Sequence, residues 1–164
     1  MKGKKRIEVL SQNLFDEKMK ELGLDDDNVE DTNLAFVSII GTPDCLKYYL
    51  DEEDTKHYFK DHPNVINLDF DDITYDEIDW KGHKIKGLSM EQAQKLFEFI
   101  ENNKDKDFYI HCRAGMSRSQ GVGAFIYYFY PGEFESDTLQ ATPNKDVYAK
   151  LSRCYYKKYK PEYE

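Results

Sequence analysis

The chain alternates short runs of β-branched and aromatic residues with longer amphipathic segments. Four short runs, at residues 6–11, 34–40, 64–70 and 107–112, have the composition of strands. Such alternation is typical of an α/β fold, in which helices connect parallel strands. A length of 164 residues suits one domain of ordinary size. We therefore predict a single domain over residues 1–164, with a central, mostly parallel sheet of about four to five strands flanked by helices.

The amphipathic segments begin with residues that cap helices. Ser11 or Asn13 can cap the first helix, and Ser89 followed by Gln92 has the spacing of a capping box. Asn144 is expected to serve as a helix cap and not as a site residue. Helices are accordingly predicted at about residues 11–22, 42–50, 89–103, 119–130 and 144–159.

A long connection between Asp71 and Gly87 separates the third predicted strand from the next helix. Connections of this length in compact domains usually carry function. Aspartates gather at its start, so we expect this segment to be an element of an active site.

Charge and hydropathy exclude several classes of protein. A net charge of −9 argues against nonspecific binding to nucleic acid or to an anionic membrane, because both need a basic face. The longest apolar runs fall well short of the roughly 20 residues that cross a bilayer. The first residues lack the apolar run of a signal peptide. We expect a cytoplasmic protein that acts as a monomer.

Three cysteines, Cys45, Cys112 and Cys154, stand at wide and irregular spacing. This spacing fits neither a disulfide framework nor a zinc site. Reduced thiols are therefore expected, and no metal or other cofactor is predicted.

The segment "YIHCRAGMSRSQG", residues 109–121, follows a predicted strand and leads into a predicted helix. A strand, a short glycine-containing loop and a helix together direct backbone N–H groups towards one point, where they bind anions. There the thiolate of Cys112 is favoured, because the N–H dipoles and nearby cationic groups lower the pKa of the thiol. Arg118 follows after five intervening residues and can return its planar guanidinium to the anion. The loop therefore predicts a thiolate nucleophile within a phosphate-binding site.

"HCRAGMSRS" resembles the His-Cys-x-x-Gly-x-x-Arg-Ser signature of cysteine-dependent protein tyrosine phosphatases. The "AG" followed by an apolar residue and "SRS" is most similar to the dual-specificity branch and its small bacterial and phage relatives. One such catalytic domain would cover nearly the whole chain. The resemblance implies a dual-specificity-phosphatase-like fold.

The resemblance also implies a role for each matching residue. Cys112 would attack phosphorus, and Ser119 would donate a hydrogen bond to the departing thiolate. His111 would tune the cysteine through hydrogen bonds of the loop. The phosphate would be bound by the loop and the arginine that ends it: Arg113, Ala114, Gly115, Met116, Ser117 and Arg118. The Arg113 side chain is equally consistent with a solvated charge at the rim.

The family takes its general acid from an aspartate that follows an upstream strand. In "NLDFDDITYDEIDW", residues 67–80, Asp72 is our first choice, Asp71 the second, and Asp76 or Asp79 the third. The family's Trp-Pro-Asp triplet is absent, and the segment between the acid and Cys112 is longer than is typical.

The resemblance implies a phosphatase that hydrolyses phosphotyrosine, with phosphoserine and phosphothreonine as further substrates, through a phosphocysteine intermediate. Its expected partner is a phosphorylated protein. One alternative is a catalytically weak pseudophosphatase that recognises a phosphorylated partner without turnover. Another is a sulfur-transfer or arsenate-reducing enzyme with a related cysteine loop. Non-protein phosphomonoesters also remain open as substrates.

Overall fold

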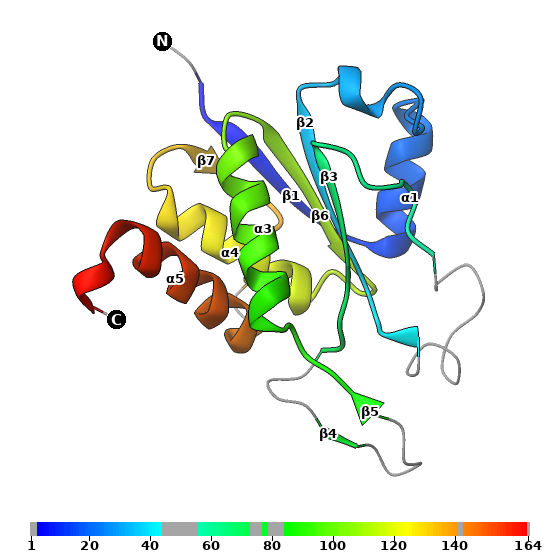
Figure 1. Ribbon diagram of the computed structural model, residues 1–164. Helices are drawn as coiled ribbons and strands as arrows, with labels where there is room; N and C mark the ends of the chain where they lie inside the picture. The colour runs from blue at the N-terminus through cyan, green and yellow to red at the C-terminus, as the bar shows by residue number, and fades with distance from the viewer. Residues whose placement is uncertain (1–2, 44–55, 73–76, 79–83, 141–142, 164) are drawn as a thin grey trace.

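The computed structural model describes residues 3–43, 56–72, 77–78, 84–140 and 143–163. Its centre is a five-stranded sheet of order β3-β2-β6-β1-β7, in which every neighbouring pair is parallel (Figure 1). The strands are β1 (Lys5–Ser11), β2 (Leu34–Ile40), β3 (Val65–Asp69), β6 (Asp107–Cys112) and β7 (Phe134–Glu135). The prediction of an α/β fold with a parallel sheet is thus confirmed.

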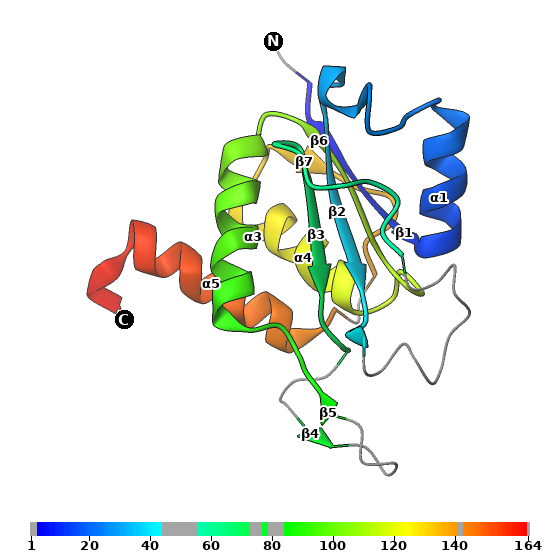
Figure 2. The ribbon, with the colours of Figure 1, turned by 45° about the vertical axis from the view of Figure 1, so that its right-hand side comes forward.

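Helices cover both faces of the sheet. Figures 1 and 2 show α1 (Gln12–Glu21) on one face and α3 (Met90–Asn103) and α4 (Arg118–Phe129) on the other. A further helix, α5 (Lys145–Tyr159), packs on α3 and α4. Connections between parallel strands are almost always right-handed. The chain moves along the sheet one way from β1 to β2 and the opposite way from β3 to β6 and on to β7, so its helices fall on opposite faces.

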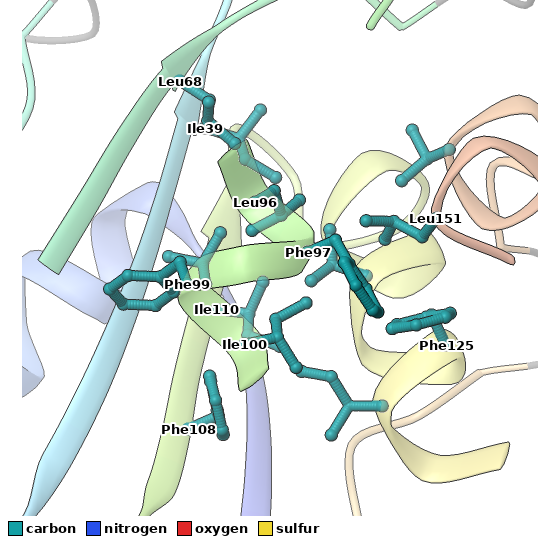
Figure 3. Close-up of a cluster of buried hydrophobic side chains, with 14 of the residues drawn as sticks. Ile39, Leu68, Leu96, Phe97, Phe99, Ile100, Phe108, Ile110, Phe125 and Leu151 are labelled. Carbon is teal, nitrogen blue, oxygen red and sulfur yellow. The ribbon is translucent and has the colours of Figure 1, made fainter. Parts of the chain in front are cut away.

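Each face of the sheet has its own hydrophobic cluster. The larger cluster lies between the sheet and α3, α4 and α5, and Figure 3 shows Leu96, Phe97 and Ile100 of α3 within it. The smaller cluster lies under α1 and includes Phe15, Met19 and Phe36. The interior strand β2 is buried along six of its seven residues, which explains its largely apolar run.

The predicted helix caps are present. Ser11 accepts a hydrogen bond from the Leu14 N–H at the start of α1. Ser89 and Gln92 form a complete capping box at the start of α3. These contacts depend on a few neighbouring residues, which is why the sequence could predict them.

Other elements differ from the predictions. The connection at 71–87, predicted as a loop, contains the short antiparallel strands β4 (Glu77–Ile78) and β5 (Lys84–Ile85). Strand β7 and the 3-10 turns η1 (Val29–Asp31) and η3 (Pro161–Tyr163) were not predicted, because elements of two or three residues leave no periodic pattern. The helix predicted at 42–50 lies almost wholly outside the described residues. Over the described ranges, none of the helices has the length and apolar character needed to span a bilayer.

Candidate active site

The loop after Cys112 lies where the sheet changes the direction of its connections. Ser11, the last residue of β1, is in register with Cys112, the last residue of β6. After β1 the chain continues into α1 on one face, and after β6 it continues into α4 on the other. In open α/β sheets, ligands bind beyond the carboxyl ends of the strands at such a switch point. The topology therefore selects this loop as the candidate site.

Carbonyl groups of the loop are bonded to the surrounding scaffold. The Gln12 N–H donates to the Arg113 carbonyl at 3.0 Å, and the Asn144 N–H donates to the Ser117 carbonyl at 3.0 Å. The Gln120 side chain donates to the Gly115 carbonyl at 3.0 Å. Because the carbonyls face outwards, the intervening N–H groups can turn inwards around the Cys112 sulfur.

Gly115 is required at the turn of this loop for two reasons. Its φ is +71°, a left-handed conformation that side chains disfavour. A Cβ atom here would also lie 2.7 Å from the Leu10 carbonyl carbon and 2.8 Å from the Ser11 nitrogen. The loop therefore packs directly against the β1 backbone, and this contact fixes the position of the loop at the end of the sheet.

Cys112 is 2% exposed, and its sulfur is surrounded by donors. Sγ lies 3.0 Å from the Ser119 hydroxyl and accepts from the Gly115 N–H at 3.2 Å. Burial alone raises the pKa of the Cys112 thiol. The Ser119 hydroxyl and N–H, the Arg118 charge and the Ser117 N–H outweigh burial, so the pKa of Cys112 lies below its usual value.

Arg118 is held at the start of α4 with part of its guanidinium uncommitted. Its Nη1 donates to the Phe70 carbonyl at 2.9 Å, which ties the loop to the end of β3. Its buried Nε–H has no hydrogen-bond partner among the described residues. An unpaired buried donor is costly unless it meets an acceptor, and a phosphate oxygen would provide one.

Asp72 lies against the rim of the cysteine loop. Its Oδ1 accepts from the Ser117 hydroxyl at 2.6 Å and from the Asn144 side-chain amide at 2.8 Å. The residue itself is exposed. An exposed carboxyl group tethered to the loop can exchange a proton with a bound ligand.

Asp71 instead belongs to the scaffold. It is 4% exposed, and its carboxylate accepts from the Thr42 N–H at 2.9 Å, the Thr42 hydroxyl at 2.8 Å and the Lys86 N–H at 2.9 Å. These bonds hold together the segments that follow β2, β3 and β5. Of the other proposed acids, Asp76 and Asp79 lie outside the described residues.

His111 is buried behind the cysteine. Its Nδ1 lies 3.3 Å from the Cys112 carbonyl oxygen, its Nε2 lies 2.7 Å from the Ser38 hydroxyl, and the Phe15 ring packs on its imidazole with centroids 4.4 Å apart. Burial lowers the pKa of His111 to about 3, and the charges of His57 and Arg118 act in the same direction, against the opposing effect of the bond to the Cys112 carbonyl. His111 is therefore neutral at physiological pH and is not an acid that delivers protons.

The residues Arg113, Ala114 and Met116 are exposed at the outer rim of the loop, with Met116 56% exposed. There they can contact whatever carries a bound phosphate, and Arg113 is consistent with both of its proposed roles.

Two further residues contact the candidate site. Asn144 caps α5 by accepting from the Val147 N–H, as predicted, and its amide also donates to Asp72, a contact that the sequence did not predict. Gln120, 1% exposed, connects the loop to Thr138 and Gln140. A single glutamine in a buried helix gives no signal in the sequence.

No cluster of three or more His, Cys, Asp or Glu side chains that could hold a metal occurs in the part of the chain that the structure describes.

Comparison with known proteins found no matching family model, no matching curated protein and no matching solved structure.

Proposed function

We propose that this protein is a cysteine-dependent protein tyrosine phosphatase with a dual-specificity-like catalytic domain. The main supporting observation is that Asp72, 40 residues before Cys112 in the sequence, is bonded to the side chain of Ser117 in the loop that surrounds the Cys112 sulfur. A nucleophile and a proton donor then face one phosphate-binding loop.

In the first step, the Cys112 thiolate attacks phosphorus and a sulfur–phosphorus bond forms as the phosphorus–oxygen bond to the substrate breaks. Arg118 and the loop N–H groups bind the non-bridging oxygens and stabilise their charge in the transition state. Asp72 gives its proton to the departing oxygen. Since Oδ1 already accepts two hydrogen bonds, Oδ2 is the oxygen that carries this proton.

In the second step, a water molecule attacks the phosphocysteine and the sulfur–phosphorus bond breaks. Asp72, now a carboxylate, removes a proton from the water, and inorganic phosphate leaves. Ser119, whose hydroxyl lies 3.0 Å from Sγ, stabilises the departing thiolate. The positive charge that both steps require comes from Arg118 and the backbone dipoles, so the proposed chemistry needs no metal.

Phosphotyrosine in a protein is the substrate we propose, with phosphoserine and phosphothreonine as further substrates. The side chains that would meet the substrate at the rim include Met116, which is exposed and apolar and suits an aromatic ring better than a polyanion. The protein's net charge of −9 also disfavours polyanionic substrates.

The test is hydrolysis of p-nitrophenyl phosphate in the presence of EDTA. We expect turnover by the wild type and none by Cys112→Ser, while Cys154→Ser, which removes a buried thiol from α5, remains active. Failure of a folded wild type to hydrolyse any phosphomonoester would overturn the proposal. If that protein still bound tungstate or a phosphopeptide, it would be a phosphate-recognising pseudophosphatase.

A further inference from the structure

A row of four side chains connects solvent to the back of the cysteine loop. Asp69 Oδ1 lies 2.6 Å from His57 Nε2, and His57 Nδ1 lies 2.6 Å from the Ser38 hydroxyl. The same hydroxyl lies 2.7 Å from His111 Nε2, and His111 Nδ1 contacts the carbonyl oxygen of Cys112 at 3.3 Å. The row thus runs from β3 through β2 to β6.

The two ends of this row lie in different environments. Ser38 and His111 are 2% and 1% exposed, so water does not compete for their hydrogen bonds. The Asp69 side chain is 47% exposed, and His57 and Asp69 border a cleft of about 410 Å³. Ser38 is the hydrogen-bonded link between the exposed end and the buried end.

The donor and the acceptor of each hydrogen bond in the row can be assigned by starting at the Cys112 carbonyl. A carbonyl oxygen only accepts, so the contact with Cys112 requires a proton on His111 Nδ1. His111 is neutral, so its Nε2 must accept, and the Ser38 hydroxyl donates to it. The Ser38 oxygen then accepts from His57 Nδ1–H. In this direction both ring nitrogens of His57 act as donors, Nδ1 to the Ser38 oxygen and Nε2 to the Asp69 carboxylate.

If donors and acceptors exchange roles along the row, the hydrogen bond from His111 to the Cys112 carbonyl is lost. If His57 carried one proton, on Nε2 beside Asp69, Ser38 would donate to His57 Nδ1. The Ser38 oxygen would then accept from His111 Nε2–H, and a neutral His111 would present an Nδ1 lone pair to the Cys112 carbonyl. The ion pair at the surface therefore decides which nitrogen of the buried histidine bears the proton.

We propose that Asp69 and His57 are positioning residues that act through Ser38 to hold His111 in the tautomer that donates to the Cys112 carbonyl. This tautomer keeps the carbonyl turned away from the sulfur and the loop N–H groups turned towards it, which favours the thiolate. The inference deepens the proposed phosphatase function, on which its catalytic consequence rests. The charged residues Asp61, Asp69 and Lys95 line the same cleft as His57.

The test is the rate at which iodoacetamide alkylates Cys112 as a function of pH, which does not depend on turnover. Ser38→Ala should move the midpoint of this profile upwards by about one pH unit, a tenfold loss of rate below the midpoint. Asp69→Asn, at an exposed position that should not disturb folding, should move it in the same direction by less. Ser38→Thr, which keeps the hydroxyl, should restore the midpoint.

Glu91→Gln is the matched control, since it removes one carboxylate from the exposed surface of α3 without touching the row. Thermal unfolding checks that all variants are folded. A profile that is unchanged in both Asp69→Asn and a folded Ser38→Ala would overturn the proposal, even if the protein proves to be a phosphatase.

Nitrogen-15 NMR of the imidazoles gives a second, direct measurement. The wild type should show His111 protonated at Nδ1, and Ser38→Ala and Asp69→Asn should show loss or mixing of that tautomer. A wild-type His111 protonated at Nε2 would contradict the proposed direction of the row. If Ser38→Ala and Asp69→Asn lost phosphatase activity but kept the wild-type tautomer and alkylation profile, that result would count against the proposal.

Discussion

The Asn144 side chain donates from its amide nitrogen to Asp72 at 2.8 Å while its amide oxygen accepts from the Val147 N–H at 3.0 Å. One planar group thus orients the proposed acid and begins α5. The arrangement therefore couples the position of Asp72 to the start of helix α5.

Asn144→Ala removes both contacts. We expect a loss of about 1 kcal/mol in the free energy of unfolding from the missing cap. We also expect a roughly tenfold lower kcat for phenyl phosphate, whose leaving group needs protonation, and little change for p-nitrophenyl phosphate. Ser89→Ala, which removes the cap of α3, should lower stability alone. Equal losses for both substrates would show that Asn144 does not act through Asp72.

Asp72→Asn and Asp71→Asn should separate catalysis from structure. Asp72→Asn should lower kcat for phenyl phosphate by about 10²-fold or more and remove its pH limb, with the stability almost unchanged. Asp71→Asn should lower the free energy of unfolding by about 1–3 kcal/mol, because an amide cannot accept all three bonds made by the carboxylate. Urea unfolding and pH–rate profiles measure the two effects, and a normal pH limb in Asp72→Asn would refute its role.

Gly115→Ala should abolish oxyanion binding at the cysteine loop, whereas Gly23→Ala should leave it intact. Both glycines have positive φ, 71° and 69°, so both substitutions cost about 1–2 kcal/mol of backbone strain. Only at Gly115 would the new methyl group meet the β1 backbone; at Gly23 nothing lies within 4 Å. Tungstate binding, measured by calorimetry, should be lost in Gly115→Ala alone. Retained binding would mean that the loop can rise off β1.

Ser119→Ala should change the slow step of the reaction. Without the hydroxyl 3.0 Å from Sγ, the phosphocysteine should break down more slowly and accumulate. Stopped-flow release of p-nitrophenol should then show a burst followed by a steady rate at least tenfold lower than in the wild type. Ser152→Ala on α5 serves as the control, and the absence of a burst in Ser119→Ala would argue against the assigned role.

His62 should make stability depend on pH. Hydrogen bonds to Asp26 and then Glu30 raise the pKa of His62 in the folded protein above 6.5, and the bond from His62 lowers the pKa of Asp26 below 3.8. A raised histidine pKa stabilises the fold below the unfolded value, and this stabilisation is lost as pH rises through the folded value. The Asp26 contribution is lost as pH falls through its lowered pKa.

Urea unfolding of the wild type and His62→Gln at several pH values tests this dependence. The stability difference should be largest between about pH 4 and 6.5 and should shrink towards pH 9. A difference that does not vary with pH would mean that His62 contributes by packing or by neutral hydrogen bonds.

The four longer strands β1, β2, β3 and β6, the capped helices and the position of the cysteine loop could be predicted from the sequence because each depends on residues that are close together in the chain. The sequence favoured Asp72 over Asp71 as the acid, but it could not show that Asp71 meets Thr42 and Asp72 meets Ser117. The contact between Ser38 and His111 depends on the register of β2 with β6. Such pairings join residues far apart in the chain, and no local pattern encodes them.

The bonds that hold the cysteine loop come from Gln12, Gln120 and Asn144, which are spread over most of the chain. These contacts join segments that are far apart in the sequence, and closing such contacts costs more chain entropy than closing local ones. The groups that lower the pKa of the Cys112 thiol, among them the Ser119 hydroxyl and the Arg118 charge, are therefore in place around the sulfur only in the folded protein.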